Sequence, residues 1–465
     1  MSNKNRKSIK QPVSKSDKHR RKKKKDDLST KSQKAAIIGV YVAVVGVVVT
    51  IILGIIGISM DKSKAEQERR ESYPSKDEFQ SRNEKDEFQG MGETAVDLIY
   101  SNTLYSQGQE FLNQADFETA AEYFEKALEE HEDMHYAKRD TARIYYALGI
   151  AYRYLYRFQD AADQYTKALG ILNGIMEAEE ISGEEKELLQ YEIGYVYFLR
   201  GNVYLNDDDY DRAVSDCQNC EGSVLLIEEN DGWDEWYSVA AVKNFHGKIC
   251  FAVAYENNSP FPSDQNTDHN TSEYDFTLKD AFDWYNSALE EKHTTRDAET
   301  ASILQNRAVV ETEWGQYDQA IKDLEEALTI CQSVPDRKQY NMGDVYFDLA
   351  LAKLYQKENE DGNALSDQET LDEYCMLMGQ ALTYTEKWFG EQHPKTAVAY
   401  ENLAFALLIK MEHDEARGYF EKAKEIFSDL GMEEDVKIEE QYLDYVDQLQ
   451  NEDEEGGNWQ LESIS

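Results

Sequence analysis

Apolar side chains recur at helical spacing along most of the chain, in pairs of adjacent segments. The clearest pair lies within residues 146–168. Gly149 and Tyr152 place a small and an aromatic side chain one turn apart on a first helix. Ala161 and Tyr165 repeat that spacing on a second helix. This pattern predicts two antiparallel helices that cross closely where the small residues lie.

Seven first helices can be marked by their small residue: Gly108, Gly149, Gly201, Gly247, Ala308, Ala350 and Ala404. In five of the units an alanine of the second helix follows this marker by 12 residues. The other two units are longer, which indicates insertions near residues 256–277 and 356–372. Each helix pair leaves one apolar face uncovered, so stacking of successive pairs into one continuous core is expected.

These units resemble the tetratricopeptide repeat, an antiparallel helix pair with this small and aromatic spacing. The resemblance implies an all-α fold, a right-handed superhelix of about seven helix pairs over residues 91–450. The last third is also similar to the longer repeats of kinesin light chains, because it contains a Gly-x-x-His-Pro turn at Gly390, His393 and Pro394. Proteins of this kind are interaction scaffolds, so the resemblance implies a protein or peptide partner and no catalysis.

The N-terminal part predicts a membrane anchor. Residues 1–34 carry 14 Lys or Arg and three Asp and form a basic arm. Residues 35–60 contain no charged side chain and would span about 39 Å as a helix, enough to cross a bilayer. Because the basic arm precedes this segment, the positive-inside rule places the N-terminus in the cytoplasm and the repeats outside it.

The segments that flank the repeats are polar. Residues 61–90 carry seven Lys or Arg and nine Asp or Glu, and are expected to form a solvated stalk. Apolar residues at helical spacing between Ile438 and Leu449 suit a terminal capping helix. Residues 451–465 are expected to form an acidic, disordered tail.

The net charge of −43 argues against a nucleic-acid binder and favours a partner with a basic surface. If the family geometry holds, four polar residues of the first helices face the groove that holds such a partner: Asn202, Asn306, Arg307 and Asn402. An exposed polar face without a ligand is the alternative. A passive spacer that self-associates is another function compatible with the repeats.

Two segments contain metal-ligand spacings. His131 and His135 form a His-Glu-x-x-His pattern, which in a metal-dependent hydrolase binds zinc. The pattern falls at the end of a second helix with no third ligand, so a surface hydrolase is only the alternative function. Five oxygen-bearing residues of the fourth-unit insertion have the spacing of a calcium loop: Asp264, Asn266, Asp268, Ser272 and Asp275. His269 replaces the required glycine there, and a polar surface loop is the default interpretation.

The five cysteines do not suggest a disulfide framework. Cys217 and Cys220 form a Cys-x-x-Cys pair, but they occupy the aromatic and alanine positions of the third unit, which favours packing in the core. Cys250 lies in the next unit, and a disulfide between Cys217 and Cys250 stays open. No phosphate loop and no nucleophile motif is present, so no catalytic residue, metal or cofactor is predicted.

Overall fold

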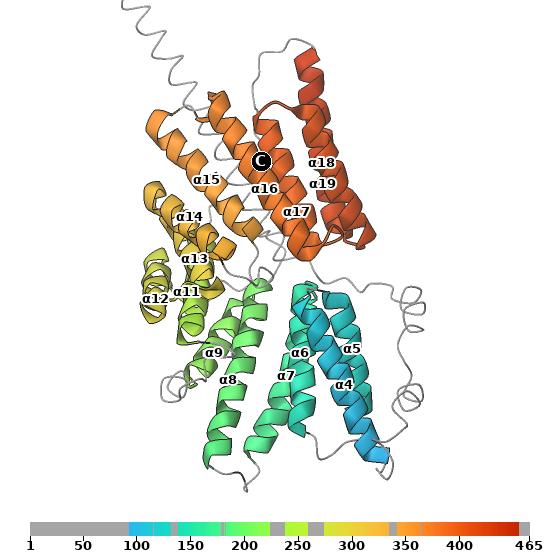
Figure 1. The fold of residues 1–465 in the computed structure, drawn as a ribbon. Helices are drawn as coiled ribbons and strands as arrows, with labels where there is room; N and C mark the ends of the chain where they lie inside the picture. Colours follow the sequence, from blue (N-terminus) through green and yellow to red (C-terminus); the bar gives the residue numbers. More distant parts are fainter. Residues whose placement is uncertain are drawn as a thin grey trace, which may run out of the picture. The chain divides into compact units, whose positions relative to one another are not determined.

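The computed structural model describes residues 93–131, 138–177, 181–223, 238–258, 274–333 and 342–454, apart from the single residues 115, 182 and 363. Every regular element in these ranges is helical (Figure 1), as the sequence predicts. The contacts described below lie within one compact unit, which includes the described residues up to residue 449.

Seven helix pairs follow one another along the chain. The first helices are α4 (Glu93–Asn113), α6 (Lys138–Tyr154), α8 (Gly183–Asn206), α11 (Val239–Asn258), α13 (Ala298–Glu313), α15 (Met342–Asp361) and α17 (Pro394–Ile409). Their second helices are α5 (Phe117–His131), α7 (Phe158–Met176), α9 (Tyr210–Glu221), α12 (Leu278–Lys292), α14 (Tyr317–Ser333), α16 (Gln368–Phe389) and α18 (His413–Asp429). Each first helix packs on its own second helix, and successive pairs from α4 to α18 pack on one another.

The small marker residues let aromatic rings approach the helix backbone. A Cβ atom on Gly149 would lie 2.6 Å from a ring carbon of Tyr165, so only glycine fits there. In the third pair the aromatic position is occupied by Cys217. Phe245 of the following first helix takes its place and lies against Gly201. The predicted contact of small and aromatic residues is therefore confirmed at the four glycine markers, where Phe245 of the neighbouring pair replaces the missing ring of the third pair.

Four of the turns between paired helices contain a residue in the left-handed region, always seven residues after the marker. They are Tyr156 (φ 59°), Asp208 (φ 56°), Gly315 (φ 72°) and Met411 (φ 67°). Only Gly315 adopts this conformation without cost. The tight turn is thus imposed by the packing of the two helices, because three of the four side chains oppose it.

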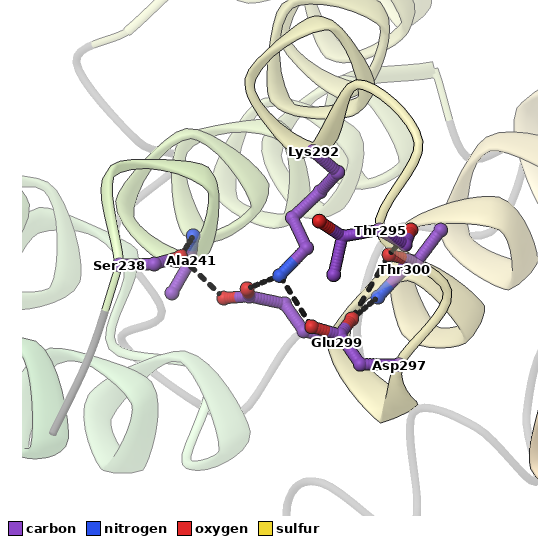
Figure 2. A network of polar contacts seen from close by, with 7 residues as sticks. All are labelled: Ser238, Ala241, Lys292, Thr295, Asp297, Glu299 and Thr300. Atoms are coloured by element: carbon purple, nitrogen blue, oxygen red, sulfur yellow. Dashed lines mark hydrogen bonds and ion pairs between the residues drawn. The ribbon is translucent and has the colours of Figure 1, made fainter. Parts of the chain in front are cut away.

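A polar network joins the fourth and fifth pairs (Figure 2). Lys292, in the last turn of α12, donates to Asp297 at 2.7 Å and to Glu299 at 2.6 Å. Asp297 caps α13 by accepting from the Thr300 amide at 2.9 Å, and Glu299 accepts from the Ser238 hydroxyl at 2.7 Å. Three helices are therefore tied together where α11 and α13 begin.

The longer units differ in how they accommodate their extra residues. Between α15 and α16 the break is short and contains one turn of 3₁₀ helix, η4 (Ala364–Ser366), so most of the extra residues lengthen the two helices. Most of the insertion between α11 and α12 lies outside the described residues.

The array ends on α19 (Glu433–Glu454), which continues past residue 450, where the acidic tail was expected to begin. Val446 of this helix is fully buried, and Tyr442 packs on Phe405 and Phe420. The basic arm, the predicted membrane segment and the stalk, residues 1–90, lie outside the described residues. Among the helices that are described, none is both long and apolar enough to span a bilayer.

Candidate functional site

From α8 to α15, each first helix contacts the next through side chains that lie three or two residues before the markers. The rings of Phe198 and Phe245 meet edge to face, 5.6 Å apart. In the next step the Asn306 amide donates to the Asn244 oxygen at 3.0 Å. The following step joins the Gln305 amide to the Asp348 carboxylate at 2.7 Å. This first-helix ladder fixes the spacing of the helices that carry the candidate site.

Arg153 is the first of two cations that the first helices hold inside the array. It lies in the last turn of α6, with its guanidinium over the Tyr154 ring, 4.7 Å from the centroid. The phenol groups of Tyr165 and Tyr195 also lie close enough to interact electrostatically with the Arg153 charge. Its surroundings are therefore aromatic and phenolic, and no ion pair of Arg153 is found in the described part of the chain.

Lys248 is the second cation and follows the marker Gly247 in α11. Its ammonium donates to the Asn202 amide oxygen at 2.7 Å, and the Asn202 nitrogen donates in turn to the Phe198 carbonyl at 2.8 Å. The amide is thus held with its oxygen towards Lys248. Burial, and then the positive charge of Arg153, lower the pKa of Lys248 to about 8. Across the described ranges, no carboxylate pairs with Lys248 either.

Two half-buried cations that repel each other are a costly arrangement. It becomes favourable when an anionic group lies between them, because charge-assisted hydrogen bonds are strongest where water is excluded. We call Arg153, Lys248 and Asn202 the cation site. Arg153 and Lys248 were not identified as site residues from the sequence. The one signal for Lys248 is its position directly after the small marker Gly247, where a charged side chain is unexpected.

The other residues that the sequence proposed for the groove are not gathered in this site. Asn306 belongs to the first-helix ladder. Arg307 points to the second helices, since its guanidinium contacts Asp323 at 2.6 Å and Asn286 at 2.8 Å. Asn402 is half-buried on α17. Of the four residues, only Asn202 lies beside an unpaired cation.

A cavity of about 250 Å³ opens between α14, α15 and α16. Its polar walls are already paired: Lys353 binds Glu373 at 2.7 Å, and Gln356 donates to Asp318 at 2.5 Å. Because these groups satisfy one another, the cavity offers a ligand less than the cation site does.

Of the two histidines in the zinc pattern, only His131 lies within the described residues. His131 is buried, and its Nδ1 lies 3.2 Å from the Thr141 hydroxyl. Burial lowers the pKa of His131. His135 lies outside the described residues. Of the calcium-loop candidates, Asp264, Asn266, Asp268 and Ser272 also lie outside, and Asp275 is exposed. Within the described ranges, no three potential ligands are placed to hold a metal ion.

The cysteines of the third and fourth pairs are buried and free. The Cys220 thiol donates to the Cys217 carbonyl at 3.0 Å, as expected for a small core residue on a helix. Burial raises the pKa of the Cys217 thiol well above its ordinary value and that of Cys250 to about 12. Both thiols therefore stay protonated and poorly nucleophilic.

Three segments of the chain match models of the tetratricopeptide repeat: residues 105–174, 300–334 and 362–429. The first segment covers most of the first and second pairs, the second covers α13 and α14, and the third covers α16, α17 and α18. No curated protein matches the chain.

Several solved structures match the chain at low identity. The Rap conjugation gene regulator of plasmid pLS20 with its Phr* peptide has 14% identity and a TM-score of 0.47, over 75% of this chain and 82% of that one. Yeast Tom70 has 16% identity and a TM-score of 0.43, over 78% and 66%. A tetratricopeptide repeat protein from Parabacteroides merdae has 14% identity and a TM-score of 0.39, over 73% and 98%.

Proposed function

We propose that the chain, of which three segments match models of the tetratricopeptide repeat, is a membrane-anchored scaffold that binds a segment of a partner protein along its first helices. The observation that carries this proposal is the cation site, where Arg153 and Lys248 lie inside the array without a carboxylate of the described chain. A carboxylate of the partner, on a side chain or at a chain terminus, would accept hydrogen bonds from both cations.

The partner that we propose also has a basic surface. The net charge of −43 creates a negative potential around the scaffold, which attracts a positively charged protein before contact. The two requirements are compatible, because every protein has a C-terminal carboxylate whatever the charge of its surface. Association is expected to weaken as salt is added. An association rate that stays constant across a wide range of ionic strength contradicts this part of the proposal.

The membrane anchor rests on the sequence of residues 35–60. Their length, their lack of charge and the basic arm before them favour a single span with the repeats outside the cytoplasm. A protease added to intact cells then digests the repeats. If they are cleaved only after the cells are broken open, the orientation is wrong, and the partner is a cytoplasmic protein.

The binding site is tested with a library of peptides made in two forms, one with a free C-terminal carboxylate and one amidated. Full-length protein in detergent is expected to bind its best peptides at least about tenfold more tightly in the free form, which corresponds to about 1.4 kcal/mol. The double variant Arg153→Met with Lys248→Met loses this preference.

Lys424→Met serves as the control, because that ammonium already pairs with Glu440 of α19 at 2.8 Å. It is expected to bind like the wild type. A library in which no peptide prefers its free form, or a double variant that keeps the preference, overturns the assignment of the cation site.

A further inference from the structure

The first-helix ladder ends in a step unlike the others. In the earlier steps two aromatic rings meet, or an amide meets an amide or a carboxylate. At the last step the residue three before the marker of α17 is Glu401, and the side chain that faces it from α19 is Glu439. Asp435 lies one turn earlier on the same helix and is close to both. Two acids therefore oppose each other where the earlier steps place at most one acid.

These three acids, which we call the carboxyl cluster, are almost completely removed from water. Glu401, Asp435 and Glu439 are 5%, 7% and 1% exposed. Both carboxyl oxygens of Glu439 and one oxygen each of Glu401 and Asp435 are buried without a hydrogen-bond partner. A buried anion with unsatisfied oxygens costs several kcal/mol, so the ionised cluster opposes the docking of α19.

No cation of the neighbouring helices offsets this cost in the part of the chain that the structure describes. On α18, Arg417 binds Asp447 and Lys424 binds Glu440, so both are engaged with other acids of α19. Glu434 adds a further negative charge near Asp435, and the Tyr442 phenol lies beside Glu401 and Glu439. The same residues are not placed to hold a metal ion. The simplest cation that fits is a proton.

We propose that the carboxyl cluster is a proton-binding site that holds the terminal helix on the array: the protonated cluster keeps α19 docked, and loss of the proton releases it. A proton on one carboxyl group supplies the O–H donor that the facing carboxylate lacks. Once the cluster ionises, repulsion between Glu401 and Glu439 adds to the cost of burial. Release of α19 uncovers Phe405 and Phe420, which Tyr442 otherwise covers.

The direction of the pH dependence follows from the same groups. Burial, reinforced by the charge of Asp435, raises the pKa of Glu401 to about 8, and burial raises that of Asp435 to about 6. Burial also raises the pKa of Glu439 well above its ordinary value. For an acid whose pKa is higher in the docked state, docking is fully favourable below the ordinary pKa and weakens as the pH rises through the raised one. The helix is therefore held in weak acid and loosens between about pH 6 and 8.

Amide hydrogen exchange of full-length protein in detergent tests the proposal, with rates corrected for the intrinsic effect of pH. The protection of α19 is expected to fall at least about tenfold between pH 6 and pH 8.5, while that of α7 changes much less. Glu439→Gln removes one titrating group and supplies an N–H donor to the cluster, so its protection should fall clearly less than that of the wild type over the same range, and the remaining fall comes from Glu401 and Asp435.

Glu440→Gln is the matched control, because it removes a neighbouring charge of α19 that is exposed and paired with Lys424. It should keep the wild-type pH dependence. Protection of α19 that does not change with pH in the wild type, or that changes equally in Glu439→Gln, overturns the proposal. So does a gain in protection at pH 8.5 on adding calcium chloride that Glu439→Gln abolishes, because a metal ion is then the ligand.

Discussion

The imidazole of His393 donates from Nε2 to the backbone carbonyl of Tyr154, 239 residues earlier in the chain, at 3.0 Å. Its Nδ1 accepts from the Lys395 amide at 3.1 Å and caps α17. The carbonyl can only accept and the amide can only donate, so the ring is the neutral tautomer with its proton on Nε2. His393 thus caps α17 and attaches this helix to the C-terminal end of α6. Its ring also contacts the Tyr156 ring there.

A proton cannot be added to His393 without breaking the cap. Burial lowers the pKa of His393 to about 4, while the unfolded chain binds its proton near pH 6.5. Between these two values the unfolded state holds more protons, so the free energy of unfolding falls as the pH drops from about 6.5 to 4. The full effect is roughly 3 kcal/mol. Urea unfolding measured at several pH values checks it.

His393→Asn separates the two roles of this residue. Asparagine is a good N-cap, so the cap of α17 survives, but the side chain is too short to reach Tyr154 and does not titrate. The variant should lose the acid-dependent part of the stability between pH 6.5 and 4 and be about 1 kcal/mol less stable at pH 7.5. The carboxyl cluster has the opposite pH dependence, so the difference between variant and wild type is the informative quantity. If the free energy of unfolding of the variant falls between pH 6.5 and 4 as much as that of the wild type, the assignment to His393 is wrong.

The contact between Tyr154 and His393 shows where prediction from the sequence ends. Gly149 and Tyr165 are 16 residues apart, and their contact follows from helix geometry alone. The bond from His393 to Tyr154 depends on the summed rotations of the four intervening helix pairs, which no local spacing encodes. The same holds for Arg153 and Lys248, which come together from different pairs. Glu401 and Glu439 look like ordinary surface acids in the sequence, because nothing local indicates that they face each other between α17 and α19.

The close approach at Gly149 predicts a contrast between two glycines of the second pair. In Gly149→Ala the new Cβ meets the Tyr165 ring at 2.6 Å, and that ring is fully buried. The clash should cost about 1–3 kcal/mol in spite of the better helix propensity of alanine. In Gly170→Ala nothing lies within 4 Å of the new methyl, so the variant should be up to about 1 kcal/mol more stable than the wild type. Thermal unfolding of both variants measures the two changes in stability. If both changes have the same sign, the Tyr165 ring does not pack as tightly against residue 149 in solution as the structure shows.

The network of Figure 2 predicts a loss of stability at the junction of the fourth and fifth pairs. The ammonium of Lys292 is mostly buried and joins Asp297 to Glu299. Although burial opposes it, hydrogen bonds from Lys292 and Thr300 lower the pKa of Asp297. Asp297 therefore stabilises the fold above about pH 4, and this contribution is lost as the pH falls through its lowered pKa.

Lys292→Met leaves both acids without their cation and should cost about 1–2 kcal/mol at pH 7. Hydrogen exchange in the first turn of α13 should rise with it. Lys279→Met is the control, because its ammonium is exposed and pairs only with Asp283 in the same helix; it should change stability by less than about 0.5 kcal/mol. Equal effects of the two substitutions would mean that the network adds nothing beyond a surface ion pair.

Two pairs share an ion pair between the residue before the marker and the second helix. Arg200 binds Asp216 through both oxygens at 2.8 Å, and Arg307 binds Asp323 at the same positions of the fifth pair. Burial raises the pKa of Asp216 in spite of its partner, so the arginine does not fully offset the cost of removing that carboxylate from water.

A double-mutant cycle follows from this balance. Arg200→Met alone should cost about 3–5 kcal/mol, because it leaves the Asp216 carboxylate, whose side chain is only 3% exposed, without a cation. Adding Asp216→Leu should restore most of that loss, since two apolar side chains then fill the space of the pair. Urea unfolding of the two single variants and the double variant measures the coupling. If the double variant is as unstable as Arg200→Met, the unpaired Asp216 carboxylate is not the source of the cost. The loss then comes from the packing and hydrogen bonds of the ion pair itself.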